Sequence, residues 1–400
     1  MLNVKKLGLS LYDTYVGEYD EYNPRYVLNK TGVPEILYVI TSNNPYSLSA
    51  EDISEKTDID SYLCKEAIKA LCKINAISIR DNKYKVNFPA FLESDIELLG
   101  WFNLEVGKVL GDKIISLSNE FDDKMSKLSC YGKHDIRILR YYVIGNCTLD
   151  GGAIDFLAGK GIITTSKLQP GDRDYLIIGY EESENVKEYS DNLLCSCNNY
   201  RTDKIEFCSF GDSMGNRKDM FRFFKRVQKN LEKATEHKTL NLSYIRLNEY
   251  INQRIAKECE RLILKSTEED MYYTALKSEE KETIDFLKEL GYLNFDDEQS
   301  KINCIVPIFN HEDSKIIEEI SDIISTGIFE TVKNTIDNLN KNLPDLTPLK
   351  HGVEFKDIAN ELWHLMFGAT NEYLVNSGFF DSPKYRDGEG RYFQFLSFRR

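Results

Sequence analysis

Two stretches of the chain repeat each other 216 positions apart, and this repeat limits the fold more than any other feature. Residues 64–89 read CKEAIKALCKINAISIRDNKYKVNFP, and residues 282–307 read ETIDFLKELGYLNFDDEQSKINCIVP. A shift of 216 pairs identical residues at seven of the 23 positions from 65 to 87: Lys65 with Lys281, Glu66 with Glu282, Ile68 with Ile284, Leu71 with Leu287, Asp81 with Asp297, Lys85 with Lys301, and Asn87 with Asn303. Each copy has the pattern of a helix that runs into a two-stranded hairpin.

Weaker matches flank this repeat on both sides. Residues 5–16 and 203–215 both alternate apolar and polar side chains like a strand. Residues 138–180 and 361–398 both read as a helix that ends near a glycine and is followed by a hairpin. Solenoid repeats have periods of about 20 to 50 residues, so a period near 200 predicts a duplicated domain.

The residues before the first copy complete a longer pattern. Residues 33–42 have the apolar spacing of a helix, and Ser49 is placed to cap a second short helix that begins at residue 50. In the third helix Leu63, Ala67, Ile68 and Leu71 mark an apolar side, and Lys65, Lys69 and Lys73 follow each other at intervals of four. The hairpin of residues 77–88 follows. This order of three helices followed by a hairpin resembles the winged-helix domains of MarR-like and ArsR-like bacterial transcriptional regulators.

The resemblance implies a DNA-binding role for the first copy. In such domains the third helix enters the major groove and the hairpin, called the wing, touches the backbone or the minor groove. Carried over to this chain, the contacts fall to Ser61, Tyr62, Lys65 and Lys69 on the helix, and to Arg80, Asn82, Lys83 and Lys85 on the wing. The second copy is less suited to DNA, because Asp285 replaces Lys69 and Glu289 replaces Lys73.

The predicted fold is α+β and mainly helical, with two tandem copies of a winged-helix plus helix-hairpin unit related by a pseudo-two-fold axis. The predicted parts are a strand and first winged helix (1–90), a long helix with a helix-hairpin module (91–185), a polar linker (186–202), a strand, basic helix and second winged helix (203–310), and a second long helix with its module (311–400). With 400 residues the chain exceeds the roughly 100 to 200 that one domain usually needs.

The charge of the chain opposes nucleic-acid binding in general. It has 65 acidic and 51 basic side chains, a net charge of −14, so DNA contact requires a local basic face. A basic helix at 218–233 is one such face. It is equally consistent with a solvated surface or with docking onto an acidic neighbour. The predicted secondary nucleic-acid or docking surface is Lys218, Arg222, Lys225, Arg226, Lys229, Lys281 and Lys301.

Other motifs point to no catalytic or metal site. Cys195, Cys197 and Cys208 with His237 have irregular spacing and no second C-x-x-C pair, so ordinary thiols are favoured over zinc ligands. Glu361 and His364 form one E-x-x-H step where a di-iron bundle needs two. Neither a phosphate-binding loop nor a nucleophile elbow is present. We therefore expect no enzyme activity, no cofactor and no metal.

The expected function is that of a DNA-binding transcriptional regulator, with double-stranded DNA as partner. A protein-interaction scaffold without nucleic-acid binding is the alternative, consistent with the acidity. A small-molecule effector, if one binds, is expected near Trp363 and Tyr392 or near Trp101 and Tyr141. The pattern fits a monomer with pseudo-two-fold symmetry or a homodimer. Nine irregularly spaced cysteines and no long apolar run predict a cytoplasmic protein without a membrane span.

Overall fold

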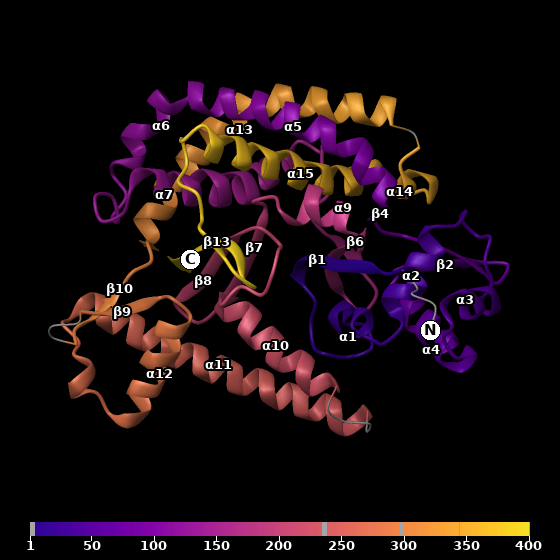
Figure 1. The fold of residues 1–400 in the computed structure, drawn as a ribbon, viewed down its shortest axis with the longest axis horizontal. Helices are drawn as coiled ribbons and strands as arrows, with labels where there is room; N and C mark the ends of the chain where they lie inside the picture. The colour runs from indigo at the N-terminus through magenta and orange to yellow at the C-terminus, as the bar shows by residue number, and fades with distance from the viewer. Residues whose placement is uncertain (1–4, 234–237, 297–299, 344, 400) are drawn as a thin grey trace. The chain divides into compact units, whose positions relative to one another are not determined.

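The chain is α+β and mainly helical in the computed structural model, which describes residues 5–233, 238–296, 300–343 and 345–399 (Figure 1). It divides into two compact units of three segments each. Unit 1 comprises 1–113, 151–192 and 325–370, and unit 2 comprises 114–150, 193–324 and 371–400. Four of the five divisions fall inside helical elements, which are α5 (Glu93–Ser116), η1 (Tyr141–Gly152), α13 (His311–Asn342) and α15 (Phe355–Asn376), and the fifth lies between residues 192 and 193. Each unit therefore combines both halves of the sequence.

Unit 1 contains the first copy of the sequence repeat. Besides its parts of the four divided helical elements, its elements are β1 (Leu7–Tyr15), α1 (Pro24–Leu28), α2 (Val33–Thr41), α3 (Ala50–Thr57), α4 (Ser61–Lys73), β2 (Ile77–Arg80), β3 (Lys83–Val86), β4 (Ala90–Phe91), α8 (Ala153–Gly159), β5 (Lys167–Gln169), β6 (Arg173–Glu181), α9 (Glu184–Val186), the π-helix η2 (Lys187–Asp191) and α14 (Thr347–Lys350). Strand β6 is the centre of its larger sheet. It pairs antiparallel with β1 and β5 and parallel with β4.

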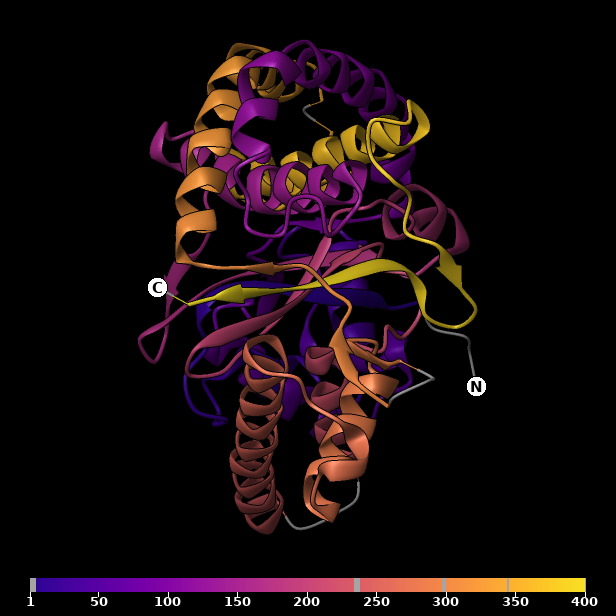
Figure 2. The ribbon, with the colours of Figure 1, turned by 90° about the vertical axis from the view of Figure 1, so that its left-hand side faces the viewer.

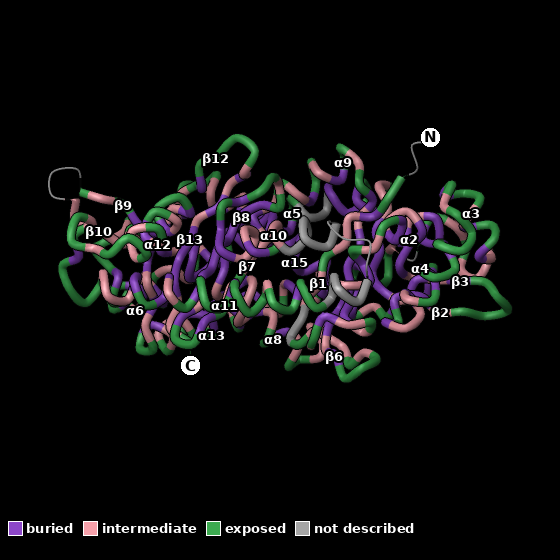
Figure 3. The backbone as a smooth tube through the Cα atoms, turned by 90° about the horizontal axis from the view of Figure 1, so that it is seen from below, coloured by how far each residue is buried: buried purple, intermediate pink, exposed green. Residues whose placement is uncertain are grey.

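The two faces of β6 serve different layers of unit 1. Tyr175 and Ile177 point into the apolar core that α2, α3, α4 and the β2–β3 hairpin share. Tyr180 points to the other face, where its hydroxyl donates to Glu361 of α15. Because side chains alternate along a strand, one strand serves both layers. The helix-hairpin segment is thus anchored to the sheet by its own core. The turn of the β2–β3 hairpin is exposed and is drawn in green in Figure 3.

Unit 2 contains the second copy. Its further elements are α6 (Ser118–Met125), α7 (Ile136–Arg140), β7 (Ser196–Arg201), β8 (Ile205–Gly211), α10 (Met220–Lys233), α11 (Lys238–Glu268), the 3₁₀ turn η3 (Tyr273–Ala275), α12 (Ser278–Glu289), β9 (Leu293–Phe295), β10 (Ile302–Cys304), β11 (Ile308–Phe309), β12 (Tyr385–Arg386) and β13 (Gly390–Phe398). Strand β13 pairs antiparallel with β8 and β12 and parallel with β11. Strand β7 extends the sheet beyond β8.

Helices cover both faces of the unit 2 sheet, as Figure 2 shows. On one face Tyr142 of η1 packs its ring against Phe393 and Phe395, with centroids 5.8 and 5.0 Å away. On the other face Leu396 belongs to the core formed with α10, α11 and α12, and Phe207 meets Tyr292 edge-on. Side chains on the two faces of β13 therefore pack into different layers, as those of β6 do in unit 1.

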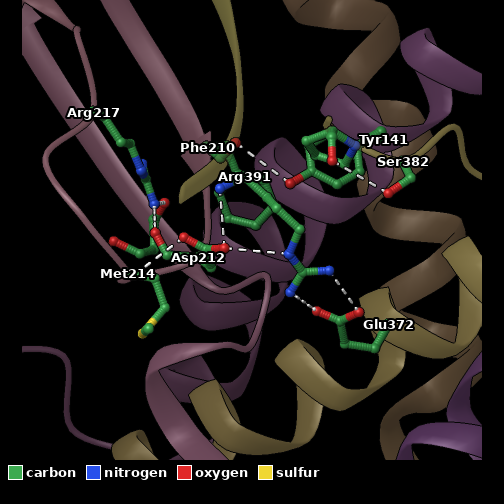
Figure 4. A network of polar contacts seen from close by, with 10 residues as sticks. Tyr141, Phe210, Asp212, Met214, Arg217, Glu372, Ser382 and Arg391 are labelled. Carbon is green, nitrogen blue, oxygen red and sulfur yellow. Dashed lines mark hydrogen bonds and ion pairs between the residues drawn. The ribbon is translucent and has the colours of Figure 1, made fainter. Parts of the chain in front are cut away.

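A partly buried network of charges fixes β13 within unit 2 (Figure 4). The guanidinium of Arg391 makes two hydrogen bonds to the carboxylate of Glu372 in α15, at 2.7 and 3.2 Å. Its Nε and its backbone amide both donate to Asp212, at 3.2 and 3.0 Å. Asp212 also accepts the amide of Met214 at 3.1 Å. The start of β13 is thus joined to α15 and to the turn after β8.

Several predicted elements differ from the structure. The long helix expected over 92–128 is interrupted at Leu117, where the amide bonds to Ile114 and tightens the turn between α5 and α6. The expected linker, 186–202, holds the boundary between the units at residues 192 and 193, but it also contains η2 and β7. Leu63, expected on the buried side of its helix, is 59% exposed, and Cys64 is buried there. Periodicity alone did not separate these neighbouring positions.

Candidate nucleic-acid interface

Helix α4 presents the predicted contact residues on its outer side. Asp60 caps its start, because the carboxylate accepts the amides of Tyr62 and Leu63 at 2.9 and 3.2 Å. The inner side is buried in the unit 1 core and carries Cys64, Ala67, Ile68 and Leu71. The four predicted contact residues of the helix are all exposed: Ser61, Tyr62, Lys65 and Lys69. The buried side therefore holds the helix while the other side faces solvent.

The β2–β3 hairpin exposes the next three predicted contacts. Asp81 and Asn82 have φ values of +52° and +57°, as a two-residue type I′ turn requires. Arg80, Asn82 and Lys83 are exposed around this turn. The guanidinium of Arg80 lies 4.1 Å from the ring centroid of Tyr46, which ties the hairpin to the loop before α3.

Lys85 differs from the other predicted contacts. It is half-buried, and its ammonium donates a hydrogen bond of 2.7 Å to the backbone carbonyl of His351. The ring of His351 is buried, and its Nε2 lies 3.1 Å from the carbonyl oxygen of Thr41. Burial lowers the pKa of His351. The structure therefore places Lys85 in the attachment of the hairpin to the rest of unit 1.

An ion pair connects α4 to α3. The ammonium of Lys65 lies 2.8 Å from the carboxylate of Glu51, and both side chains are more than half exposed. The pair raises the pKa of Lys65 and lowers that of Glu51. Among the described residues, Lys69 has no ion-pair partner. Sequence spacing contains no signal for the role of Glu51, because the contact exists only where α3 packs against α4.

A groove of about 470 Å³ lies between α4 and the hairpin. Its lining is mostly apolar, with Ala50, Ile68, Cys72, Ile79 and Tyr84. Lys65, Lys69, Glu51 and Asn82 complete the lining with polar groups. Tyr62, Leu63 and Ile79 add exposed apolar surface, at 72%, 59% and 53%. No sequence pattern indicated this groove, since its lining residues come from α3, α4 and the β2–β3 hairpin.

The charges of this surface nearly balance. Residues 50–83 carry seven acidic side chains, Glu51, Asp52, Glu55, Asp58, Asp60, Glu66 and Asp81, and six basic ones, Lys56, Lys65, Lys69, Lys73, Arg80 and Lys83. All are exposed or half-buried. Lys73 is paired with Glu21 across a short contact. Cations available to phosphate are therefore concentrated at Lys69, at the hairpin turn, and at Lys65 once Glu51 releases it.

The corresponding segment of unit 2 is built differently. Between α11 and α12 the chain forms the single turn η3, where unit 1 has the two-turn helix α3. Lys281 is half-buried with its ammonium 5.5 Å from the ring centroid of Tyr273, and Lys301 is paired with Asp270 at 2.6 Å. Both predicted cations thus already have partners within unit 2.

The predicted basic surface at 218–233 is partly occupied by other groups of unit 2. Lys218 is paired with Glu389 at 3.3 Å, and half-buried Arg222 donates a hydrogen bond of 2.6 Å to the carbonyl of Gly215. Burial lowers the pKa of Arg222 to about 10. Lys225 is exposed and Arg226 is half-buried. Lys229 lies outside the residues whose side chains the structure describes.

The residues predicted to flank an effector are distributed over both units. Trp363 belongs to unit 1 and is fully buried. Tyr141 and Tyr392 belong to unit 2, where Tyr141 is also fully buried. The side chain of Trp101 lies outside the described residues. Tyr392 also lines a pocket within unit 2.

Comparison of the chain with family models, with curated proteins and with solved structures finds no match to any of them.

Within the described residues, no group of three or more His, Cys, Asp or Glu side chains is placed to hold a metal ion. His237, weighed above as a zinc ligand, lies outside those residues. Nor does any described helix have the length and apolarity needed to span a membrane.

Proposed function

We propose that the chain is a DNA-binding transcriptional regulator that contacts double-stranded DNA through α4 and the β2–β3 hairpin of unit 1. The supporting observation is that Ser61, Tyr62, Lys65 and Lys69 are exposed on one side of a helix whose other side is anchored in a core. The exposed turn residues Asn82 and Lys83 extend the same element pair. In a winged helix, the helix side chains read bases and the hairpin contacts phosphate.

The proposal includes an internal duplication of a winged-helix unit. It is supported by the shared pairing of the two larger sheets, since β6 and β13 each pair with one parallel strand and with two antiparallel strands. It is also supported by the hairpins β2–β3 and β9–β10, which follow α4 and α12. The second copy has the single turn η3 in place of α3, so we assign DNA contact to the first copy.

Salt dependence tests the proposal directly. Binding of the full chain to a random-sequence duplex of 20 base pairs is measured by fluorescence anisotropy at 50 and 200 mM salt. With two or three phosphate contacts, the affinity is expected to fall roughly 10- to 40-fold between these salt concentrations. Absence of binding at both salt concentrations would refute DNA binding.

A protein-interaction scaffold is the second candidate, and the groove beside α4 favours it. The groove is mostly apolar and the surrounding charges nearly balance, which suits a peptide better than a phosphate backbone. Both candidates use the same face of unit 1. The salt experiment separates them, because a scaffold without nucleic-acid binding leaves the anisotropy of the duplex unchanged at either salt concentration.

Glu51→Gln is expected to strengthen DNA binding. The substitution removes the carboxylate that pairs with Lys65 at 2.8 Å and leaves the ammonium available to phosphate. An exposed ion pair is weak, so the affinity should rise only about 1.5- to 5-fold. Glu55→Gln is the matched control, since it makes the same change in net charge on α3, and Glu55 has no ion-pair partner among the described residues. Equal effects of both variants would show that the Lys65 pair does not limit binding.

The proposal assigns no catalytic residue, cofactor or metal, and it places the protein in the cytoplasm. Cys64 and Cys259 are free thiols, and burial raises the pKa of both. Free thiols of this kind are typical of a reducing compartment.

A further inference from the structure

Unit 2 contains a pocket of about 170 Å³ beside the end of α12. We call it the Gly291 pocket, because the backbone of Gly291 forms part of its wall. Its apolar lining includes Ile138, Tyr142, Val306, Pro307 and Phe393. His134, Arg386, Tyr392 and Gln394 add polar groups. An apolar cavity of about 150 Å³ accommodates benzene, so the pocket has room for one compact apolar group.

At the equivalent place in unit 1, side chains are joined by hydrogen bonds. Asn75 follows α4 in the left-handed conformation, with φ of +56°, and Gly291 follows α12 with φ of +83°. The side-chain amide of Asn75 donates a hydrogen bond of 3.1 Å to Gln169. Gln169 pairs with Arg173 across its hairpin, and Arg386 pairs with Gly390 in the same way in unit 2. Asn75 also accepts a hydrogen bond from Asn87. In unit 2 the glycine has no side chain to make such bonds, and the space remains open.

The hydrogen bond to the carbonyl at the end of the helix comes from a different strand residue in each unit. In unit 1 the hydroxyl of Tyr175 donates to the carbonyl of Ile74, the last residue before Asn75. In unit 2 the carbonyl of Leu290, at the equivalent position, accepts instead from the amide of Gln394 at 2.8 Å. This frees the hydroxyl of Tyr392 to accept from Arg386 at 3.0 Å and to donate to Glu389 at 2.7 Å. A guanidinium is thereby positioned at the pocket.

The charge at the pocket selects the ligand. Arg386 is the permanently charged group among the described lining residues, and none of those residues is acidic. Its guanidinium lies 4.9 Å from the ring centroid of Tyr392, and its side chain is 52% exposed. Glu389 is 3.8 Å from Arg386 but is also paired with Lys218 at 3.3 Å, so one carboxylate is shared by two cations. A positive charge therefore remains for an anionic group.

We propose that the Gly291 pocket binds a small carboxylate with a compact apolar body. The carboxylate pairs with the guanidinium of Arg386, and the apolar body occupies the open space beside Gly291. The imidazole of His134 is an additional hydrogen-bonding group, and burial lowers its pKa, which keeps it neutral at pH 7. This site does not depend on DNA binding by unit 1.

Calorimetric titration of the full chain with cyclohexanecarboxylate at pH 7 tests the proposal. A ligand of this size in a suitable pocket is expected to bind with a Kd below about 1 mM. Acetate, which lacks the apolar body, and cyclohexanecarboxamide, which lacks the charge, should each bind at least about tenfold more weakly. Undetectable binding of cyclohexanecarboxylate at about 10 mM would overturn the proposal.

Two variants locate the site. Gly291→Asn is expected to abolish binding by filling the pocket. It should preserve the fold, because Asn tolerates positive φ and a Cβ at Gly291 would have Gln394 as its nearest neighbour, 3.7 Å away. Gly378→Asn is the matched control: Gly378 also has positive φ, at +75°, and open space around it. It should leave the affinity unchanged, and equal loss in both asparagine variants would overturn the assignment.

Arg386→Gln provides the independent measurement. It is expected to weaken carboxylate binding about tenfold while leaving the affinity for the amide unchanged, because only the charged ligand uses the guanidinium. Equal weakening of both ligands would assign Arg386 a structural role and would overturn the proposed recognition. Since the variant retains the hairpin and the glycine, it tests the site even if Gly291→Asn does not fold.

Discussion

Replacing Lys65 and Lys69 together by glutamate is expected to weaken binding to duplex DNA about 100-fold at 50 mM salt. Both side chains lie on the exposed side of α4, and the substitution replaces two cations by two anions at the proposed contact. The slope of log affinity against log salt should also fall by about two, since two phosphate contacts are lost. Fluorescence anisotropy with the random-sequence duplex measures both quantities.

The control for this variant is a double substitution in unit 2. Lys281→Glu with Lys288→Glu changes the net charge by the same amount on α12, the corresponding helix. Its affinity for the duplex should stay within a few fold of the wild type, because the proposed contact residues on α4 are unchanged. Unchanged binding by the Lys65 and Lys69 variant would refute the assignment of α4. Equal loss in both doubles would show that net charge, and not α4, controls binding.

Arg391→Ala is expected to lower the free energy of unfolding of unit 2 by about 3 kcal/mol at pH 7. The arginine holds two carboxylates, Glu372 through two hydrogen bonds and Asp212 through its Nε (Figure 4). The side chain of Asp212 is only 2% exposed, so its charge would remain buried without its ion-pair partner, with backbone amides still donating to it. Urea denaturation followed by circular dichroism measures the loss.

The pH dependence of this loss has a definite sign. Burial raises the pKa of Asp212 even with Arg391 beside it. Without the guanidinium the folded-state pKa rises further, so on acidification folded Asp212 binds its proton before the unfolded chain does. The destabilisation is therefore greatest at pH 7 to 8 and shrinks toward pH 5. A loss that stayed constant over this range would contradict the buried-charge explanation.

Arg201→Ala is the matched control for this experiment. Arg201 also belongs to the unit 2 sheet and pairs with Glu206 at 2.7 Å, but its side chain is 66% exposed. Its removal should cost less than about 1 kcal/mol, because the Arg201 side chain is solvated and Glu206, at 20% exposed, keeps more contact with water than Asp212 does. A cost equal to that of Arg391→Ala would mean that burial does not set the strength of the network.

Local sequence signals predicted the elements around α4 well. Ser49 caps α3, as its position before residue 50 indicated, and in the structure Asp52 completes a capping box. The dipeptide Asp81-Asn82 forms the turn of the predicted hairpin, since both residue types tolerate positive φ. These interactions act within a few residues, so a single sequence contains them completely.

The sites depend on contacts between distant segments. Glu51 pairs with Lys65, Lys85 bonds to the backbone of His351, and Arg391 connects Asp212 to Glu372. No periodicity, cap or turn encodes such pairs, because each requires two elements to pack in one register. Lys85 is the clearest example: its sequence position in the hairpin suggested phosphate contact, and packing gave its ammonium a carbonyl partner.

The sequence by itself determined the helix-hairpin elements of both copies, because hydrophobic period, caps and turn residues act over one or two turns of chain. Only the tertiary structure decided that each unit combines both halves of the sequence and that a carboxylate of α3 pairs with Lys65. It also decided that Gly291 borders an open pocket, whereas Asn75 bonds to Gln169 at the equivalent place in unit 1. The physical reason is that packing joins residues far apart in the chain, and their side chains then set which cations are available and which spaces remain open.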